Sequence, residues 1–190
     1  VRVRPADYLP DTAGGTAATA WDTRTDSTGA WLIDSLPPGT YAIEINDQRA
    51  AAAVRTITLD GVADFVEMDT IELLRHAGLT GTVSLPEADS ATAADIMVYG
   101  LERLVRVWGP QVTYAFSDIP PGAYSVRIQS PAPRYSSQTI AGVAAVEGDT
   151  QQVEPVILNP YATWAYMREA ELSTAVGSGI GLTEELYDFP

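Results

Sequence analysis

The chain has 190 residues, 46% of them hydrophobic, and its 25 acidic residues against 11 basic ones give a formal charge of -14. Such a charge repels phosphate backbones and anionic lipid surfaces, so nucleic acid is not expected as a partner. No apolar run approaches the roughly 18 residues that cross a bilayer, which argues against membrane insertion. Every basic residue is Arg and Cys is absent, which excludes Lys-based isopeptide cross-links and disulfides. Because the first residue is Val1 rather than Met, we expect a processed product whose original N-terminus lies upstream.

Apolar and polar residues alternate with a period of two through most of the chain, which predicts an all-β protein of short strands. In the first half, the predicted strands are residues 1–4, 30–34, 40–46, 54–59 and 65–74. In the second half, they are residues 79–85, 95–101, 105–107, 112–117, 123–129, 137–140 and 152–158. Small and polar stretches such as DTAGGTAATA at 11–20 are predicted to be loops.

One phrase occurs twice, as DSLPPGTYAIEI at 34–45 and SDIPPGAYSVRI at 117–128, and this indicates two copies of one small domain. In each copy the second proline and the glycine, Pro38–Gly39 and Pro121–Gly122, predict a type II turn with positive φ at the glycine. The aromatic and aliphatic residues at matched alternating positions are predicted to be core side chains. These are Trp31, Ile33, Leu36 and Tyr41 in the first copy and Tyr114, Phe116, Ile119 and Tyr124 in the second.

The stretch TDSTGAWLIDSLPPGTYAIEI at 25–45 resembles the carboxypeptidase regulatory-like, or transthyretin-like, β-sandwich family. The second copy keeps the later half of this pattern, as VTYAFSDIPPGAYSVRI at 112–128. The resemblance covers about residues 1–159 and implies two tandem Greek-key sandwiches, prealbumin-like or Ig-like, at 1–75 and 76–159, followed by an extended tail at 160–190. It also implies modules without enzymatic activity on secreted, mainly bacterial, cell-surface proteins. The fold is better specified by these motifs than the function.

Aligning the two copies predicts a missing strand. The second copy begins with GLTGTVSL at 78–85, which resembles the first strand of the family, whereas the first copy opens at VRVRP, the equivalent of the second strand. The strand next to the missing one would then have unpaired backbone groups and an apolar edge beside Val1 and Val3. The alternative is that this strand lies upstream in a longer precursor.

The tail after Pro160 has alternating large residues, which predict a spare strand, although a helix at 164–176 is a competitor because its residues are good helix formers. A domain short of a strand and a chain with a spare one suggest donor-strand complementation, in which each tail completes a neighbouring copy. The alternative is that the tail folds back onto its own chain. The residues expected at the subunit contact are Val1, Val3, Trp164, Tyr166, Met167, Leu172 and Val176.

The sequence therefore predicts a structural subunit of an extracellular filament that polymerises with copies of itself. Two other functions are considered, a passive spacer module of a large surface protein and a carbohydrate-binding module. The second would need solvent-facing aromatic residues to bind surface glycans, and only Trp21 and Trp108 lie outside the matched core positions.

Catalytic and metal sites find little support in the sequence, and no cofactor is expected. His76 is the only histidine, so a zinc site lacks a second imidazole or thiol, and we expect an exposed linker residue. Ser178 in GSGIG lacks a candidate base, and this stretch is expected to be a flexible bend. Three acidic pairs could hold calcium in loops, although none matches an EF-hand and solvated acids are the alternative. They are Asp22 with Asp26, Asp60 with Asp64, and Glu147 with Asp149.

Overall fold

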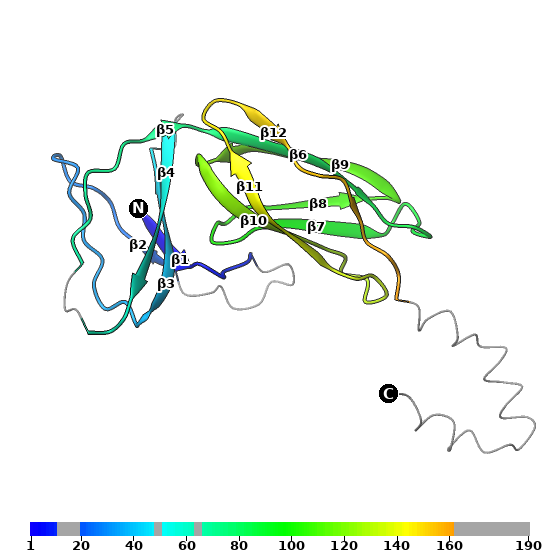
Figure 1. The fold of residues 1–190 in the computed structure, drawn as a ribbon, viewed down its shortest axis with the longest axis horizontal. Helices are drawn as coiled ribbons and strands as arrows, with labels where there is room; N and C mark the ends of the chain where they lie inside the picture. The colour runs from blue at the N-terminus through cyan, green and yellow to red at the C-terminus, as the bar shows by residue number, and fades with distance from the viewer. Residues whose placement is uncertain (11–19, 48–50, 63–65, 162–190) are drawn as a thin grey trace, which may run out of the picture.

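The structure is a computed structural model that describes residues 1–10, 20–47, 51–62 and 66–161. The described residues form thirteen strands and no helix, so the predicted all-β class is confirmed. Within this part of the chain, no helix is long and apolar enough to cross a membrane. Figure 1 shows an N-terminal sheet, β1 to β5, standing beside a sandwich built from β6 to β13.

The N-terminal sheet has the order β2-β1-β3-β4-β5, and all its pairs are antiparallel. Its strands are β1 (Arg2–Pro5), β2 (Trp21–Asp22), β3 (Gly39–Asn46), β4 (Ala51–Leu59) and β5 (Leu74–Arg75). The long pair of β3 and β4 is the centre of the sheet, with Ile43 opposite Arg55. Strand β5 ends directly before the sandwich begins at Ala77.

The C-terminal sandwich has two sheets. One has the order β11-β10-β7-β8, and in the other β6 pairs antiparallel with β9 and parallel with β12 and β13. The strands are β6 (Ala77–Ser84), β7 (Ala93–Val98), β8 (Leu104–Trp108), β9 (Gln111–Ile119), β10 (Gly122–Gln129), β11 (Gln138–Ala145), β12 (Thr150–Gln152) and β13 (Val156–Ile157). Between the sheets lies one apolar core that includes fully buried Leu79, Ile96 and Ile128.

One sheet of each copy has the same strand order. The order β4-β3-β1-β2 of the N-terminal sheet repeats the order β11-β10-β7-β8 of the sandwich, and Val3 pairs with Ile43 as Val98 pairs with Val126. The second sheet, built around β6, has no counterpart among the described N-terminal residues. The domain boundaries at 75 and 159 stay predictions.

Two of the predicted strands are wrong. Residues 30–34 form no strand, and of the described residues 66–74 only Leu74 belongs to one. The cause is visible in the second copy, where the equivalent residues, in β9, β12 and β13, all pair with β6. An alternating sequence forms a ladder only when a partner strand supplies the hydrogen bonds.

The repeated corner is not the predicted type II turn. Neither Gly39 nor Gly122 has positive φ, so the predicted role of both glycines is wrong. Instead, the tyrosine two residues later turns back over the glycine, and its hydroxyl donates a hydrogen bond to the carbonyl of the first proline. The distances are 2.8 Å from Tyr41 Oη to Pro37 O and 2.6 Å from Tyr124 Oη to Pro120 O.

The glycines of this corner make room for the tyrosine ring. A Cβ atom on Gly39 would lie 3.3 Å from Tyr41 Oη, and one on Gly122 would lie 3.1 Å from Val54 Cγ1 and 3.4 Å from Tyr124 Oη. The arrangement resembles the tyrosine corner of immunoglobulin-like sandwiches, where a tyrosine hydroxyl bonds the backbone a few residues upstream. The prolines Pro38 and Pro121 follow the carbonyls that accept these bonds.

Buried charges join the N-terminal sheet to the sandwich. We call Arg4, Tyr8, Glu44, Glu102 and Arg103 the junction cluster. Arg4 is 3% exposed and Glu44 is 6% exposed. The Glu44 carboxylate accepts a hydrogen bond from Arg103 Nη2 at 2.8 Å and lies 3.7 Å from Arg4 Nη1. Arg4 Nη2 and Tyr8 Oη both donate to Glu102 Oε2, at 3.0 and 2.6 Å.

Because these groups come from both sides of the junction, they hold the sheet against the sandwich. The backbone adds a bond from Gly100 N to Tyr8 O at 2.9 Å. Burial, followed by the hydrogen bond to Glu102, raises the pKa of Tyr8 to about 12. The phenol therefore stays protonated and keeps donating at neutral pH.

Candidate functional site

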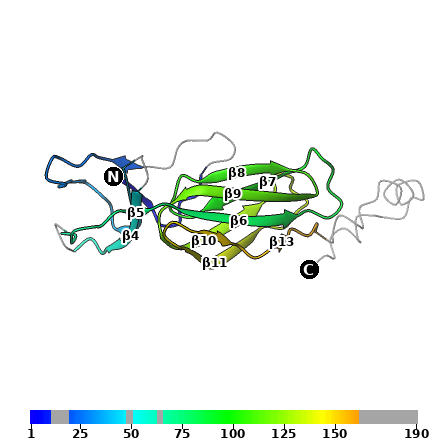
Figure 2. The same ribbon diagram turned by 90° about the horizontal axis from the view of Figure 1, so that it is seen from above.

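The N-terminal sheet has an apolar face that points away from the sandwich. Val3, Tyr41 and Ile43 are its buried centre, with exposed fractions of 0%, 4% and 2%. Two segments without ladder pairing, residues 30–36 and 66–73, lie over this face (Figures 1 and 2). We call these two segments the cover. Among the described residues, no backbone hydrogen bond joins residues 31–36 or 66–73 to a strand.

The cover is less buried than the equivalent layer of the sandwich. At eight matched positions, six in the cover and two (Val1 and Ile45) in or beside the sheet beneath it, the N-terminal copy has a half-buried apolar residue where the second copy has one that is at most 6% exposed. The half-buried residues are Val1, Trp31, Ile33, Leu36, Ile45, Met68, Ile71 and Leu73. Their equivalents are Ile96, Tyr114, Phe116, Ile119, Ile128, Val153, Val156 and Leu158.

The difference has one physical cause. In the sandwich, β6 lies between β9 and the pair β12 and β13, and its residues Leu79 and Val83, with Leu85 directly after it, are all 0% exposed. The N-terminal cover lacks such a central strand within the described residues. Its backbone donors and acceptors are therefore without ladder partners, and its apolar side chains keep contact with water.

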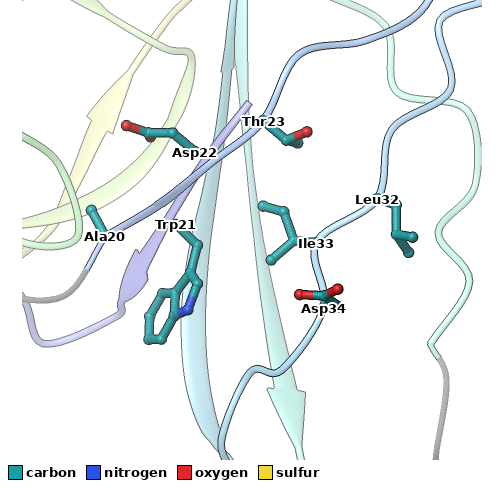
Figure 3. A pocket seen from close by; sticks show the side chains of 7 residues that line it. All are labelled: Ala20, Trp21, Asp22, Thr23, Leu32, Ile33 and Asp34. Carbon is teal, nitrogen blue, oxygen red and sulfur yellow. The ribbon is translucent and has the colours of Figure 1, made fainter.

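An open cleft of about 360 Å³ lies beside the cover, between β2 and residues 32–34. Figure 3 shows the Ile33 side chain pointing toward Trp21, whereas Leu32 lies on the other side of the segment. Leu32 is 65% exposed. In the sandwich the corresponding strands β8 and β9 contact each other at this place. The cleft indicates that residues 30–36 are not paired into a complete second sheet.

The expected edge at β1 is wrong. The sequence predicted unpaired backbone groups beside Val1 and Val3, but β1 pairs with β2 on one side and with β3 on the other. Val3 is fully buried, and Val1 is half-buried against the same cluster. By comparison with β6, an added strand would instead lie between the two cover segments. The other residues expected at the contact, Trp164, Tyr166, Met167, Leu172 and Val176, lie outside the described residues.

Of the two tryptophans considered for sugar binding, Trp21 is a packing residue. Its ring meets the ring of Tyr41 edge to face, with centroids 5.7 Å apart at 84°, and this contact was not foreseen from the sequence. Trp108, near the end of β8, is 59% exposed. One exposed tryptophan is a weak basis for a carbohydrate site.

The acids considered for calcium have protein partners. Asp22 accepts two hydrogen bonds from Arg2, at 2.6 and 3.1 Å, and this hydrogen-bonded ion pair lowers the pKa of Asp22. Asp26 Oδ1 accepts bonds from the Thr28 hydroxyl and from the backbone of Thr28 and Ala30, which lowers its pKa. No group of three or more metal-binding side chains occurs in the described part of the chain.

Three further acids considered for calcium also bind protein groups. Asp60 accepts from Val62 N, Asp149 from Thr150 N, and Glu147 from Arg75. Asp64 lies outside the described residues.

His76 is not the exposed linker residue that the sequence predicted. It is half-buried between β5 and β6, and its Nε2 atom is buried without a hydrogen-bond partner in the described structure. Its carbonyl accepts a bond from Gly148 N at 3.2 Å, which ties the connection to the sandwich. Ser178 and the surrounding GSGIG stretch lie outside the described residues.

Comparison with known proteins gives little. No protein-family model and no curated protein matches the chain. Among solved structures, the chain is similar over part of its length to a chain of the Coh3ScaB-XDoc_M1ScaA complex, an N-terminal interface mutant of the type II cohesin-X-dockerin complex from Acetivibrio cellulolyticus. The identity is 15% and the TM-score 0.35, and the match spans 43% of this chain and 56% of that chain. A likeness of this size carries no inference about function.

Proposed function

We propose that this protein is a structural subunit of an extracellular filament, in which the cover of one copy is completed by a β-strand from the tail of the next. The observation that carries the proposal is the set of eight apolar positions that are half-buried in the first copy and buried in the second. Burying one large apolar side chain contributes about 1.5 to 3 kcal/mol. An added strand that completes the burial of several such side chains therefore binds with substantial affinity.

The second copy also supplies the direction of the added strand. Strand β6 runs antiparallel to β9 and parallel to β12 and β13. By the same pairing, a donor runs antiparallel to residues 30–36 and parallel to residues 66–73. Because residues 66–73 lead into β5 and then into β6, the donor points toward the junction with the sandwich and enters from the opposite end of the sheet.

Donor and acceptor are different surfaces of one chain, so the contact is heterologous and propagates unless it closes into a ring. The tail after Tyr161 has 29 residues, enough for a strand and a connection. The net charge of -14 makes two copies repel each other, so the apolar burial in the strand contact must outweigh this repulsion. No step of this function needs a catalytic group or a cofactor, and the only partner is a second copy.

The first test compares the full chain with a chain ending at Tyr161, which keeps the hydrogen bond from Tyr161 N to Arg134 O. We expect the full chain to sediment as concentration-dependent polymers and to form filaments in negative-stain images. The shortened chain should remain a monomer. A full chain that stays monomeric at high concentration refutes the filament, whether its tail folds back in cis or the acceptor belongs to residues that precede Val1 in a longer chain.

A matched pair of variants tests the acceptor. Ile33→Asp places a charge on the inward side of the cover, whereas Leu32→Asp places the same charge on a side chain that is already 65% exposed. The first should prevent assembly and the second should assemble like the parent. Circular dichroism melts of both variants show whether the sheet itself remains folded, and equal assembly of the two would contradict the proposed acceptor.

If the chain proves monomeric, the spacer function remains. The junction cluster favours it, since the Arg103–Glu44 and Arg4–Glu102 ion pairs join the sheet to the sandwich, as a rigid spacer requires.

A further inference from the structure

The finished sheet of the second copy shows what a central strand must look like at one position. Gly81 of β6 pairs with Tyr114 of β9, and a Cβ atom on Gly81 would lie 2.6 Å from Tyr114 Oη and 2.7 Å from Tyr114 Cζ. These distances leave no room for a side chain, because Cβ atoms do not approach other heavy atoms that closely. The tyrosine ring crosses the strand at the glycine.

The remaining inward positions of this strand are large and apolar. Leu79, Val83 and Leu85 are each 0% exposed and alternate along the chain with Gly81. The resulting pattern is large, small, large, large at every second residue, with the small residue opposite the aromatic ring.

The first copy has Trp31 where the second has Tyr114. Tryptophan is larger than tyrosine, so a donor strand needs a small residue opposite Trp31 at least as strictly as β6 needs Gly81 opposite Tyr114. A donor with a large residue at this position would push the ring out of the cover and lose the burial that drives binding.

One window in residues 162–190 has this pattern. It is VGSGIGL, which places Val176, Ser178, Ile180 and Leu182 where β6 and the residue after it have Leu79, Gly81, Val83 and Leu85. A donor that began at Trp164 would place Tyr166 opposite Trp31, and one that began at Leu172 would place Ser178 at the last apolar position. Neither of these windows satisfies the pattern.

We infer that the donor strand is residues 176–182, with Ser178 packed against Trp31 of the neighbouring copy; this rests on the proposed strand exchange. Of the tail residues expected at the contact from sequence, only Val176 then lies in the donor. Residues 162–175 become the connection between subunits, with a reach of at most about 50 Å. The outward positions of the donor are Gly177, Gly179 and Gly181.

The test uses two serine substitutions in the full chain. Ser178→Trp places a large ring opposite Trp31, whereas Ser173→Trp places the same ring in the connection. We expect complete loss of polymer in sedimentation and negative-stain images for the first and parental assembly for the second. Assembly of Ser178→Trp equal to that of the parent overturns the register. Loss of polymer only in Ser173→Trp also overturns it and places the donor upstream.

A second measurement separates this inference from the proposed function. Synthetic peptides 174–186 and 162–173 are added in excess to the assembling full chain. We expect the first peptide to cap the chains as monomers and the second to have no effect. Capping by 162–173 alone refutes the register and leaves strand exchange intact, whereas a parent chain that forms no polymer at all refutes strand exchange itself.

Discussion

The tyrosine corner allows a quantitative prediction because it occurs twice in different surroundings. Tyr124 is 7% exposed, and its hydroxyl lies 2.6 Å from the carbonyl oxygen of Pro120, which is itself buried. Tyr41 is 4% exposed, but its acceptor Pro37 is an exposed residue, 2.8 Å away. Removing the hydroxyl therefore has different consequences in the two copies.

In Tyr124→Phe the carbonyl of Pro120 loses its partner inside the protein. The loss combines a hydrogen bond of about 1 kcal/mol with the desolvation cost of a buried acceptor, so we expect the free energy of unfolding to fall by about 1.5 to 2.5 kcal/mol. In Tyr41→Phe water can replace the phenol at Pro37, and the expected fall is about 0.5 to 1 kcal/mol. For a chain of this length, 1 kcal/mol corresponds to about 2 to 4 °C in Tm.

Urea unfolding followed by circular dichroism measures both changes. Tyr161→Phe is the control, since this tyrosine is 49% exposed and its change should stay within about 0.5 kcal/mol. The reasoning fails if Tyr124→Phe is as stable as the control. It also fails if Tyr41→Phe proves to be the more destabilising of the two substitutions.

Three further predictions concern the charged groups. Glu44→Ala removes the carboxylate that the buried Arg4 and the partly buried Arg103 share, and we expect the free energy of unfolding to fall by about 3 kcal/mol and the radius of gyration in X-ray scattering to increase. Tyr8 should titrate near pH 12 in an absorbance titration that Tyr8→Phe removes; its contribution to stability is complete below about pH 10, the ordinary pKa, and is lost as the pH rises through about 12. Asp22 has a lowered pKa because Arg2 donates hydrogen bonds to it, so its contribution is present above the ordinary pKa of about 3.9 and is lost as the pH falls through the lowered value. Arg2→Ala should return the Asp22 pKa, measured by carboxyl NMR shifts, to the ordinary range.

The candidate site was predictable from sequence only in its outline. Comparing the two copies predicts that no segment within residues 1–75 is equivalent to GLTGTVSL, the first strand of the second copy. The neighbours that an equivalent strand would have were not predictable. The sequence suggested β1, yet β1 has partners on both sides, and the segments left without partners are residues 30–36 and 66–73. Which strand lies beside which depends on contacts between residues far apart in the chain.

The LPPGTY corner was also predictable only in part. The phrase LPPGTY identifies a tight turn, because proline and glycine restrict or free the backbone locally, but it does not show why the glycine is needed. The answer is a ring that folds back from two residues away, with the hydroxyl of Tyr41 on Pro37 O. Gly81 is a similar case, since its role depends on Tyr114 in a strand that follows much later.

The all-β class and the inward positions of Trp31 and Ile33 could be predicted from the residue pattern, since period-two alternation is a local property of the chain. Whether an alternating segment forms a strand depends on its partners in the folded chain. Residues 30–34 alternate as residues 112–117 do, but only the second segment has β6 beside it. A β-ladder needs backbone partners from elsewhere, and hydrogen bonds between distant segments are not encoded in the pattern of either one.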